Sequence, residues 1–294
     1  STRRMGTARV DHGAQHMKPK APWFQTQMDA WVEAGAAAPW ARAFPTGDGR
    51  TPPGDATQAY RGAHGMSSVP KLLAEGLDVH TSHRVASVDI HDAHLCLRID
   101  DDEPLEASAV LVTAPVPQAV ALLDGVPMDP TLRAELEALT YDPCFAVLVT
   151  LAGPSAVPAP GGLALEGGPI AWIADNTQKG ISPDRHAVTI HATAAYTHAH
   201  LDDDPADVER ELLAAAKPWL GSDVVEAQVH RWMYAFPTAT AAEPFAVVSD
   251  APPVLVAGDA FGGPRVEGAA LSGFAAAAWL TRRLGSDAGA PTGR

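Results

Sequence analysis

The chain has 294 residues, enough for one large or two modest domains with an ample hydrophobic core. Its hydrophobic fraction of 46% and charged fraction of 19% are typical of a globular protein. The formal charge of −14 argues against a nucleic-acid or anionic-membrane partner, because both require clustered Lys and Arg. The two cysteines, Cys96 and Cys144, form neither a CxxC motif nor a metal-ligand spacing, so no disulfide framework is expected.

No apolar run reaches the length of a membrane span, and the first residues lack the apolar core of a signal peptide. These features predict a cytoplasmic protein. The twelve histidines do not combine with carboxylates or cysteines at the spacing of a metal site, so no metal is expected.

In the first 124 residues, the chain is expected to be extended over 1–16. Helical spacing and glycine or proline boundaries then predict three helices: 24–34, 69–76 and 118–123. Alternating or continuous apolar residues predict four strands: 77–80, 84–90, 94–99 and 109–114. The second and third of these strands are predicted to form an antiparallel pair.

Residues 125–248 have a different pattern, in which strands are grouped and helices are few. The predicted strands are 145–151, 170–174, 187–193 and 224–235, and one amphipathic helix is predicted over 207–220 after Asp204-Pro205. Grouped strands favour an antiparallel sheet, whereas the flanking sequence alternates strands and helices. We therefore predict an α/β domain that is split in sequence (1–20, 61–124 and 249–284), a second domain (21–60 and 125–248) and a disordered tail (285–294).

The most informative segment runs from Val254 to Gly273. An apolar strand (Val254 to Ala257) ends sharply at Gly258-Asp259, and further glycines lead into an Ala-rich stretch with helical spacing. A helix that begins with so few side chains exposes its backbone N–H groups and the positive end of its dipole, which suits a phosphate or an electron-rich heterocycle. Asp259 is placed to accept a hydrogen bond from a ligand hydroxyl, or else it caps the helix N-terminus.

The full wording of this segment, Gly-Asp followed by Gly-Gly-x-Arg-Val-Glu-Gly-Ala-x-x-Ser-Gly, closely resembles the C-terminal flavin-binding segment of renalase-like FAD-dependent oxidoreductases, within the flavin amine oxidase superfamily. Other segments resemble the same family in the same order, and together they span nearly the whole chain. After Asp11-His-Gly-Ala-Gln15 the family commonly continues Tyr-Phe, whereas this chain has His16-Met17. The further segments are Gly65 to Pro70, Arg84-Val85, Thr113 to Gln118, Tyr141 to Cys144, Ile173 to Asn176 and His230 to Ala235.

The resemblance implies an α/β plus antiparallel β architecture: a two-domain FAD/NAD(P)-binding flavoprotein fold with a split FAD domain. It also implies non-covalent FAD as the cofactor. The residues that match its cofactor contacts are Gly13, Ala14, Gln15, Val85, Gly258, Asp259, Arg265, Val266, Glu267, Gly268 and Ala269. From sequence alone Val85 is more commonly an ordinary strand residue, and Arg265 and Glu267 could equally form a solvated ion pair.

Candidate residues on the substrate side, and so candidate catalytic residues, are Asn176, His191 and Trp232, again by their match to family segments. A histidine inside an apolar strand is commonly structural, and a tryptophan is commonly part of a core. The sequence leaves those alternatives open.

The G-x-G-x-x-G motif that opens a dinucleotide fold is absent from the sequence. Ser1 to Gln15 resembles the stretch directly after the Gly-Gly-Arg-Met segment of the family, so we expect the fold to be N-terminally truncated. One hypothesis is that an initiator methionine was assigned within that Arg-Met segment.

The expected reaction is hydride transfer from a small reduced substrate, either a dihydronicotinamide or an amine, to flavin N5, with reoxidation by O₂ as the electron acceptor. The alternative is a flavin-free remnant that serves as a binding or interaction module. The sequence does not indicate an oligomeric state.

Overall fold

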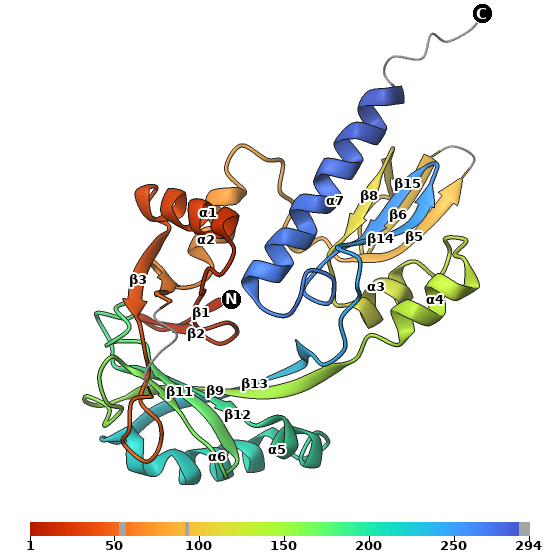
Figure 1. Ribbon diagram of the computed structural model, residues 1–294. Helices are drawn as coiled ribbons and strands as arrows, with labels where there is room; N and C mark the ends of the chain where they lie inside the picture. The colour runs from red at the N-terminus through yellow and green to blue at the C-terminus, as the bar shows by residue number, and fades with distance from the viewer. Residues whose placement is uncertain (53–56, 92–93, 288–294) are drawn as a thin grey trace, which may run out of the picture. The chain divides into compact units, whose positions relative to one another are not determined.

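The structure, a computed structural model, describes residues 1–52, 57–91 and 94–287 (Figure 1). Its chain divides into two compact units. Unit 1 comprises Ser1–Asp78 and Asp142–Ala235, and unit 2 comprises Val79–Tyr141 and Phe236–Arg294. Each unit is described by itself.

Unit 1 is built on a five-stranded sheet with the order β10-β11-β12-β9-β13. The β10–β11, β11–β12 and β12–β9 pairs are antiparallel. The strands of the unit are β1 (Thr2–Met5), β2 (Ala8–Asp11), β3 (Ala37–Ala41), β4 (Ala59–Gly62), β9 (Tyr141–Leu151), β10 (Gly162–Ala164), β11 (Ile170–Asp175), β12 (Ala187–Ala192) and β13 (Val224–Pro237). Its helices are α1 (Pro22–Glu33), α2 (Ser68–Leu73), α5 (Ala194–Ala199) and α6 (Pro205–Leu220).

Both faces of this sheet are covered, which explains why its central strand reads as an unbroken apolar run. Side chains alternate between the faces of a strand. In β9, Phe145 and Val147 belong to the core under helix α6 (Figure 1), whereas Ala146 and Leu148 pack against the β1–β2 hairpin on the other face. The hairpin therefore lies against the sheet, and this packing places Asp11, the last residue of β2, beside the sheet.

Helix α6 ends at Leu220 as predicted and begins at Pro205, two residues before the predicted start but directly at the Asp204-Pro205 signal. The Asp204 carboxylate accepts a hydrogen bond from the Ala206 N–H at 2.8 Å, and Pro205 occupies the first turn. Gly221 ends the helix in the left-handed conformation, with φ of 71°. The buried residues Val208 and Leu212 face the sheet.

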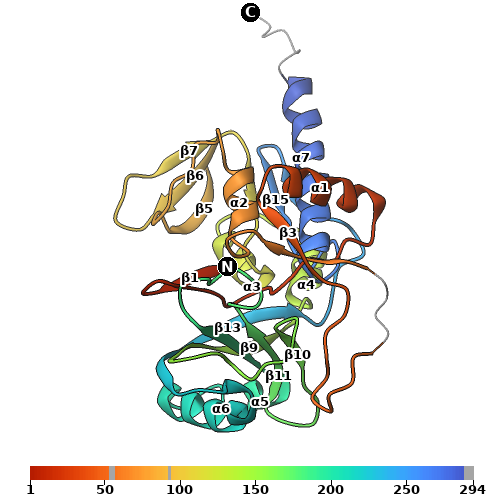
Figure 2. The same cartoon turned by 90° about the vertical axis from the view of Figure 1, so that its left-hand side faces the viewer.

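Unit 2 contains two three-stranded sheets, β14-β15-β8 and β5-β6-β7. Its strands are β5 (Val85–His91), β6 (His94–Ile99), β7 (Leu105–Ala107), β8 (Val110–Val112), β14 (Ala246–Asp250) and β15 (Pro253–Val256). Its helices are α3 (Val116–Leu122), α4 (Pro130–Glu137) and α7 (Val266–Asp287). Figure 2 shows the antiparallel β5-β6-β7 sheet, which confirms the pairing expected for 84–90 with 94–99.

The β14-β15-β8 sheet is the α/β element of unit 2, because β15 and β8 are parallel. Alternate residues of β15 again enter different cores. Val254 and Val256 join the core formed with helices α3 and α4, whereas Leu255 packs with Ala276 of α7. The strand is therefore buried on both faces, as its continuous apolar sequence indicates.

Several sequence-based expectations are wrong in detail. Residues 77–80 form no strand, and α2 ends at Leu73 rather than at Gly76. Helices α4 and α5 and strands β3, β4, β7, β10 and β14 are additions that the sequence patterns do not predict. Residues 285–287 continue α7 instead of belonging to a disordered tail, and 288–294 lie outside the described residues.

The compact units do not coincide with the predicted domain boundaries, because residues 1–20 and 61–78 fall in unit 1. The boundaries of the domains themselves stay a prediction. None of the helices in the described part of the chain has the length and apolarity needed to cross a membrane.

Candidate functional site

The candidate cofactor residues of unit 2 lie in the turn between β15 and α7. The Gly258 N–H donates a hydrogen bond to Ser272 Oγ at 2.9 Å, which folds the start of the turn back onto the helix. Gly258 has φ of 155°, and a Cβ atom there would meet only open space. The backbone at Gly258 is therefore open to the close approach of a ligand.

A second contact closes the turn against the first turn of α7. A Cβ atom on Gly262 would overlap the Gly268 carbonyl, and one on Gly268 would overlap the Gly263 carbonyl. Only glycine allows these two stretches of backbone to touch. Arg265 between them has a left-handed φ of 92°, which is uncommon for a side chain other than glycine.

Asp259 is held by Tyr141, the first residue of β9. Tyr141 Oη donates to Asp259 Oδ1 at 3.5 Å and accepts the Val116 N–H at 3.3 Å. Burial raises the pKa of the Asp259 carboxyl and raises the pKa of Tyr141 to about 12. Because α7 begins at Val266, the interpretation of Asp259 as the cap of that helix is wrong.

The first turn of α7 presents backbone N–H groups that have no acceptor within the helix. Val266, Glu267, Gly268 and Ala269 form this turn. The Ala269 N–H donates to the Arg265 carbonyl at 3.1 Å, so Val266, Glu267 and Gly268 supply the remaining N–H groups. A helix of this length carries a positive partial charge at its N-terminus, which favours an anion or a group that gains negative charge.

Val85, the remaining candidate in unit 2, is the first residue of β5, where it pairs with Ile99. Its side chain packs against the core that contains Val88 and Leu95. Its side chain thus packs as that of an ordinary strand residue does. A contact between the Val85 backbone and a cofactor stays a prediction.

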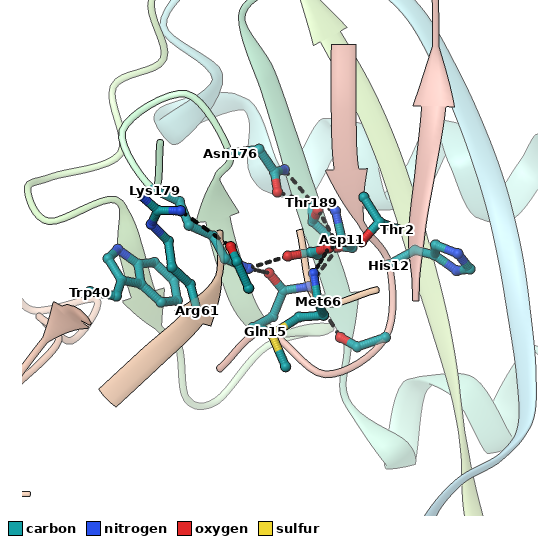
Figure 3. A network of polar contacts seen from close by, with 12 residues as sticks. Thr2, Asp11, His12, Gln15, Trp40, Arg61, Met66, Asn176, Lys179 and Thr189 are labelled. Carbon is teal, nitrogen blue, oxygen red and sulfur yellow. Dashed lines mark hydrogen bonds and ion pairs between the residues drawn. The ribbon is translucent and has the colours of Figure 1, made fainter. Parts of the chain in front are cut away.

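In unit 1, a network of polar contacts centres on Asp11, as Figure 3 shows. Asp11 Oδ2 accepts from Lys179 Nζ at 2.8 Å, and Asp11 Oδ1 accepts from Thr2 Oγ1 at 2.6 Å and from the Met66 N–H at 2.8 Å. Lys179 Nζ also donates to Gln15 Oε1 at 3.1 Å. The Asp11 carboxylate thus accepts three hydrogen bonds, one from a cation and two from neutral groups. These bonds offset the free-energy cost of removing the charged group from water.

Asn176 belongs to the same network. Its Oδ1 accepts the Asp11 N–H at 3.3 Å, and its Nδ2 donates to Thr189 Oγ1 at 3.0 Å. Thr189 Oγ1 in turn donates to the Asp11 carbonyl at 2.8 Å. The Asn176 side chain is completely buried, so it links β2 to β12, and its predicted place beside a substrate stays a prediction.

The other two candidate residues on the substrate side meet at His12. The His12 carbonyl accepts from Trp232 Nε1 at 2.9 Å, and His191 Nε2 lies 3.2 Å from the same oxygen. The His12 and Trp232 rings are stacked, with centroids 5.2 Å apart. Burial lowers the pKa of His12 and of His191 to about 4, so both imidazoles are neutral at pH 7.

The sequence candidates therefore fall into two groups. Unit 1 brings together Gly13, Gln15, Asn176, His191 and Trp232 around the segment 11–15, with Ala14 exposed. Unit 2 brings together the candidates between Gly258 and Ala269. Val85, the other candidate in unit 2, lies on β5.

Sequence reasoning does not single out Lys179, Tyr141 or Ser272. Lys179 follows the family-like segment that ends at Asn176, and a lysine in a polar stretch usually predicts exposure. Tyr141 lies within a family-like segment, but nothing local links it to Asp259, 118 residues away. Ser272 is part of the terminal motif. Its position on the second turn of the predicted helix is the only feature of the sequence that could have indicated its contact with the preceding turn.

The parallel strands β8 and β15, the glycine turn and the long helix α7 together define a nucleotide-binding α/β fold. The model of the family described as flavin containing amine oxidoreductase matches residues 8–280. This range is most of the chain, and the chain belongs to that family.

Solved structures similar to this chain include oxidases and an oxidoreductase. A protein from Exiguobacterium sp. 255-15, provisionally assigned as a protoporphyrinogen oxidase, is 19% identical with a TM-score of 0.58, over 77% of this chain and 52% of its own. An oxidoreductase from Methanosarcina mazei is 19% identical with a TM-score of 0.54, over 76% and 56%.

A wild-type putrescine oxidase bound to putrescine is 17% identical with a TM-score of 0.54, over 76% of this chain and 54% of its own. Similarity at this level of identity establishes the fold. The chain spans about half the length of these solved structures.

Proposed function

We propose that the protein is an FAD-dependent oxidoreductase of two domains, in which a split FAD domain carries the cofactor and a second domain faces the substrate. The observation that carries this proposal is the β15–α7 turn. Gly258 and Gly263 both have positive φ, a Cβ atom on either would meet only open space, and the turn leads into the N-terminus of α7. A flavin dinucleotide has the hydroxyls and phosphates that such a turn can hold, and a ring that gains negative charge when it is reduced.

The roles of the chain's own residues follow from their chemistry. Asp259 would accept a hydrogen bond from a cofactor hydroxyl through the oxygen that Tyr141 does not use. The N–H groups of Val266, Glu267 and Gly268 would stabilise negative charge at the pyrimidine edge of the flavin, and Ala269, whose N–H donates to the Arg265 carbonyl, would complete that turn of the helix. The segment Gly13 to Gln15 would lie beside the flavin ring, because Gly13 has no side chain and Lys179 and the Asp11 carbonyl hold the Gln15 side chain.

On the substrate side, His191 and Trp232 hold the His12 carbonyl, and His12 is neutral at pH 7. His12 Nδ1 is buried and has no hydrogen-bond partner among the described residues. This nitrogen is therefore available to form a hydrogen bond with a substrate. The flavin, when bound, supplies the hydride acceptor at N5, so the protein needs to orient the substrate rather than to provide a strong base.

The proposed substrate is a small reduced molecule, either an amine or a dihydronicotinamide, and O₂ is the proposed electron acceptor. Membership of the amine oxidoreductase family and the similarity to putrescine oxidase support the amine. The resemblance of the terminal motif to renalase-like proteins supports the dihydronicotinamide.

The test is a titration of the purified chain with FAD, followed by absorption and fluorescence spectra of the flavin. Because residues 1–294 contain no G-x-G-x-x-G motif, the titration is made with this chain and with one that also carries the residues encoded directly upstream. Bound FAD that is bleached anaerobically by an amine or by a reduced nicotinamide, and recovers in air, supports the proposal and identifies the substrate class. Failure of both chains to bind FAD would overturn it in favour of a flavin-free binding module.

A further inference from the structure

A cavity of about 400 Å³ lies in unit 1, and neither Asp11 nor His12 lines it. Its walls are the β1–β2 hairpin, the end of α1 and helix α2. Its charged residues are Arg4, Arg9, Lys71 and Glu75. In a chain with a formal charge of −14, three permanent cations against one carboxylate is a local reversal of sign.

Two of these cations face each other. Arg4 on β1 and Arg9 on β2 are directly opposite partners in the antiparallel hairpin. Like charges at opposite positions of a strand pair destabilise it, so an anion between them would stabilise the hairpin.

Within residues 1–52, 57–91 and 94–287, no ion pair joins the side chain of Arg4, Arg9 or Lys71 to a carboxylate. Glu75 lies four residues after Lys71, in the turn that follows α2, and the two form no ion pair of 4 Å or less. The cations of the cavity are therefore not neutralised by the described protein.

The wall of the cavity also carries hydroxyl donors. Ser68 Oγ accepts the His64 N–H at 3.1 Å, which leaves its hydroxyl hydrogen to be donated elsewhere, and both residues line the cavity. Guanidinium, ammonium and hydroxyl groups around one space are the donors that bind phosphoryl oxygens in proteins.

We propose that this cavity binds a phosphoryl group of a small molecule. The three positive charges outnumber the single negative charge of Glu75. The excess matches the two or more negative charges of a phosphate ester or a pyrophosphate. The volume lies within the range of small-molecule sites. Two sources can supply the group, the pyrophosphate of a flavin dinucleotide or the phosphate of a second molecule, and the proposal concerns the chemistry that they share.

The test is calorimetric titration of the full chain with inorganic pyrophosphate, for the wild type and for Arg9→Gln and Lys71→Gln. Each substitution is expected to weaken binding about tenfold, because each removes a charge-assisted hydrogen bond. Arg42→Gln and Lys217→Gln are matched controls, since both residues are exposed and lie outside the cavity, and they are expected to leave binding unchanged.

Glu75→Gln provides a test in the opposite direction, because it removes the carboxylate from the wall of the cavity and is expected to tighten pyrophosphate binding. This result does not depend on whether the arginine variants fold. A wild-type chain that does not bind pyrophosphate, or control variants that lose as much affinity as Arg9→Gln and Lys71→Gln, would overturn the proposal.

Competition separates the two sources. If FAD displaces pyrophosphate, the cavity holds the cofactor's own phosphates. If FAD and pyrophosphate bind without mutual effect, the site belongs to a second phosphorylated molecule. Because pyrophosphate binding is measured without flavin, its failure is distinguishable from a failure of the chain to bind FAD.

Discussion

Lys179 Nζ lies 2.8 Å from Asp11 Oδ2, and both side chains are completely buried. The ammonium group also lies 4.9 Å from the centre of the Trp40 ring, and it donates to Gln15 Oε1. Burial lowers the pKa of Lys179, and the nearby Asp11 carboxylate opposes this shift. The pair joins the loop after β11 to the end of β2, and so fixes the segment on which His12, Gly13 and Gln15 lie.

Replacing one partner of this pair should be costly. Lys179→Met leaves Asp11 buried without its cation, and the free energy of unfolding is expected to fall by about 3–5 kcal/mol. The measurement is urea denaturation followed by tryptophan fluorescence. Lys217→Met on the exposed face of α6 is the control and should change stability little.

The double variant Asp11→Leu/Lys179→Met removes both charges and should recover part of the loss, because it leaves no unpaired charge buried. A Lys179→Met variant as stable as the control would show that the ion pair is not needed for the fold.

The start of a helix can be predicted from local sequence where a capping residue precedes a strong apolar pattern. Asp204-Pro205 predicts α6, and Asp129-Pro130 carries the same signal for α4, although no helix is predicted there. Asp129 accepts hydrogen bonds from the Thr131 and Leu132 N–H groups. Helix α4 is eight residues long with a single fully buried residue, Leu136, so its hydrophobic periodicity is too weak to predict a helix.

Part of the candidate site can likewise be predicted from local sequence, and part depends on contacts between residues that are far apart in the chain. The β15–α7 turn is formed by residues close together in sequence, and its glycines can be identified without a structure. The contact between Asp11 and Lys179 joins residues 168 apart, and a lysine buried in a loop has no local pattern. Such contacts depend on how β2 packs against the sheet, which sequence periodicity does not specify.

Acid should destabilise unit 1 through its buried histidines. The pKa of His191 is lowered to about 4 from the ordinary value of 6.5, so between these pH values the unfolded chain binds a proton that the folded chain does not. The stability that this group provides is fully present above pH 6.5 and is lost as the pH falls towards 4. The loss is on the order of 2 to 3 kcal/mol, and His12, with the same shift, adds to it.

His191→Gln should therefore flatten the fall in stability between about pH 6.5 and 4, because glutamine can donate to the His12 carbonyl without titrating. The check is the urea midpoint measured over this pH range. His94→Gln on an exposed strand end is the control. If the variant and the wild type lose stability in parallel, the burial of His191 does not couple to protons.

Gly268→Ala should disrupt the β15–α7 turn. The added methyl group would overlap the Gly263 carbonyl, so the turn must move away from the helix. Affinity for FAD is expected to fall at least tenfold, on the basis that a displaced backbone costs more than about 1.4 kcal/mol of binding free energy. Gly273→Ala in the same helix meets no atom within 4 Å and should bind FAD normally, with stability unchanged or increased by up to about 1 kcal/mol.

Tyr141→Phe should change the pH dependence of FAD binding. The Tyr141 hydroxyl donates to Asp259 Oδ1, and this hydrogen bond lowers the pKa of a carboxyl that burial raises. Without the hydroxyl the pKa of Asp259 should rise further, so the ionised carboxylate that accepts the cofactor hydroxyl is lost at a higher pH. The acid limb of FAD affinity, measured by flavin fluorescence, should therefore move to higher pH in the variant.

Two further variants make this measurement specific to Asp259. Asp259→Asn keeps a hydrogen-bond acceptor but does not titrate, so its FAD affinity should be weaker and should lack the acid limb. Tyr196→Phe removes a tyrosine hydroxyl that donates to Glu211 in unit 1, and it should leave the acid limb in place. An acid limb that is the same in Tyr141→Phe, Tyr196→Phe and the wild type would mean that Tyr141 does not control Asp259.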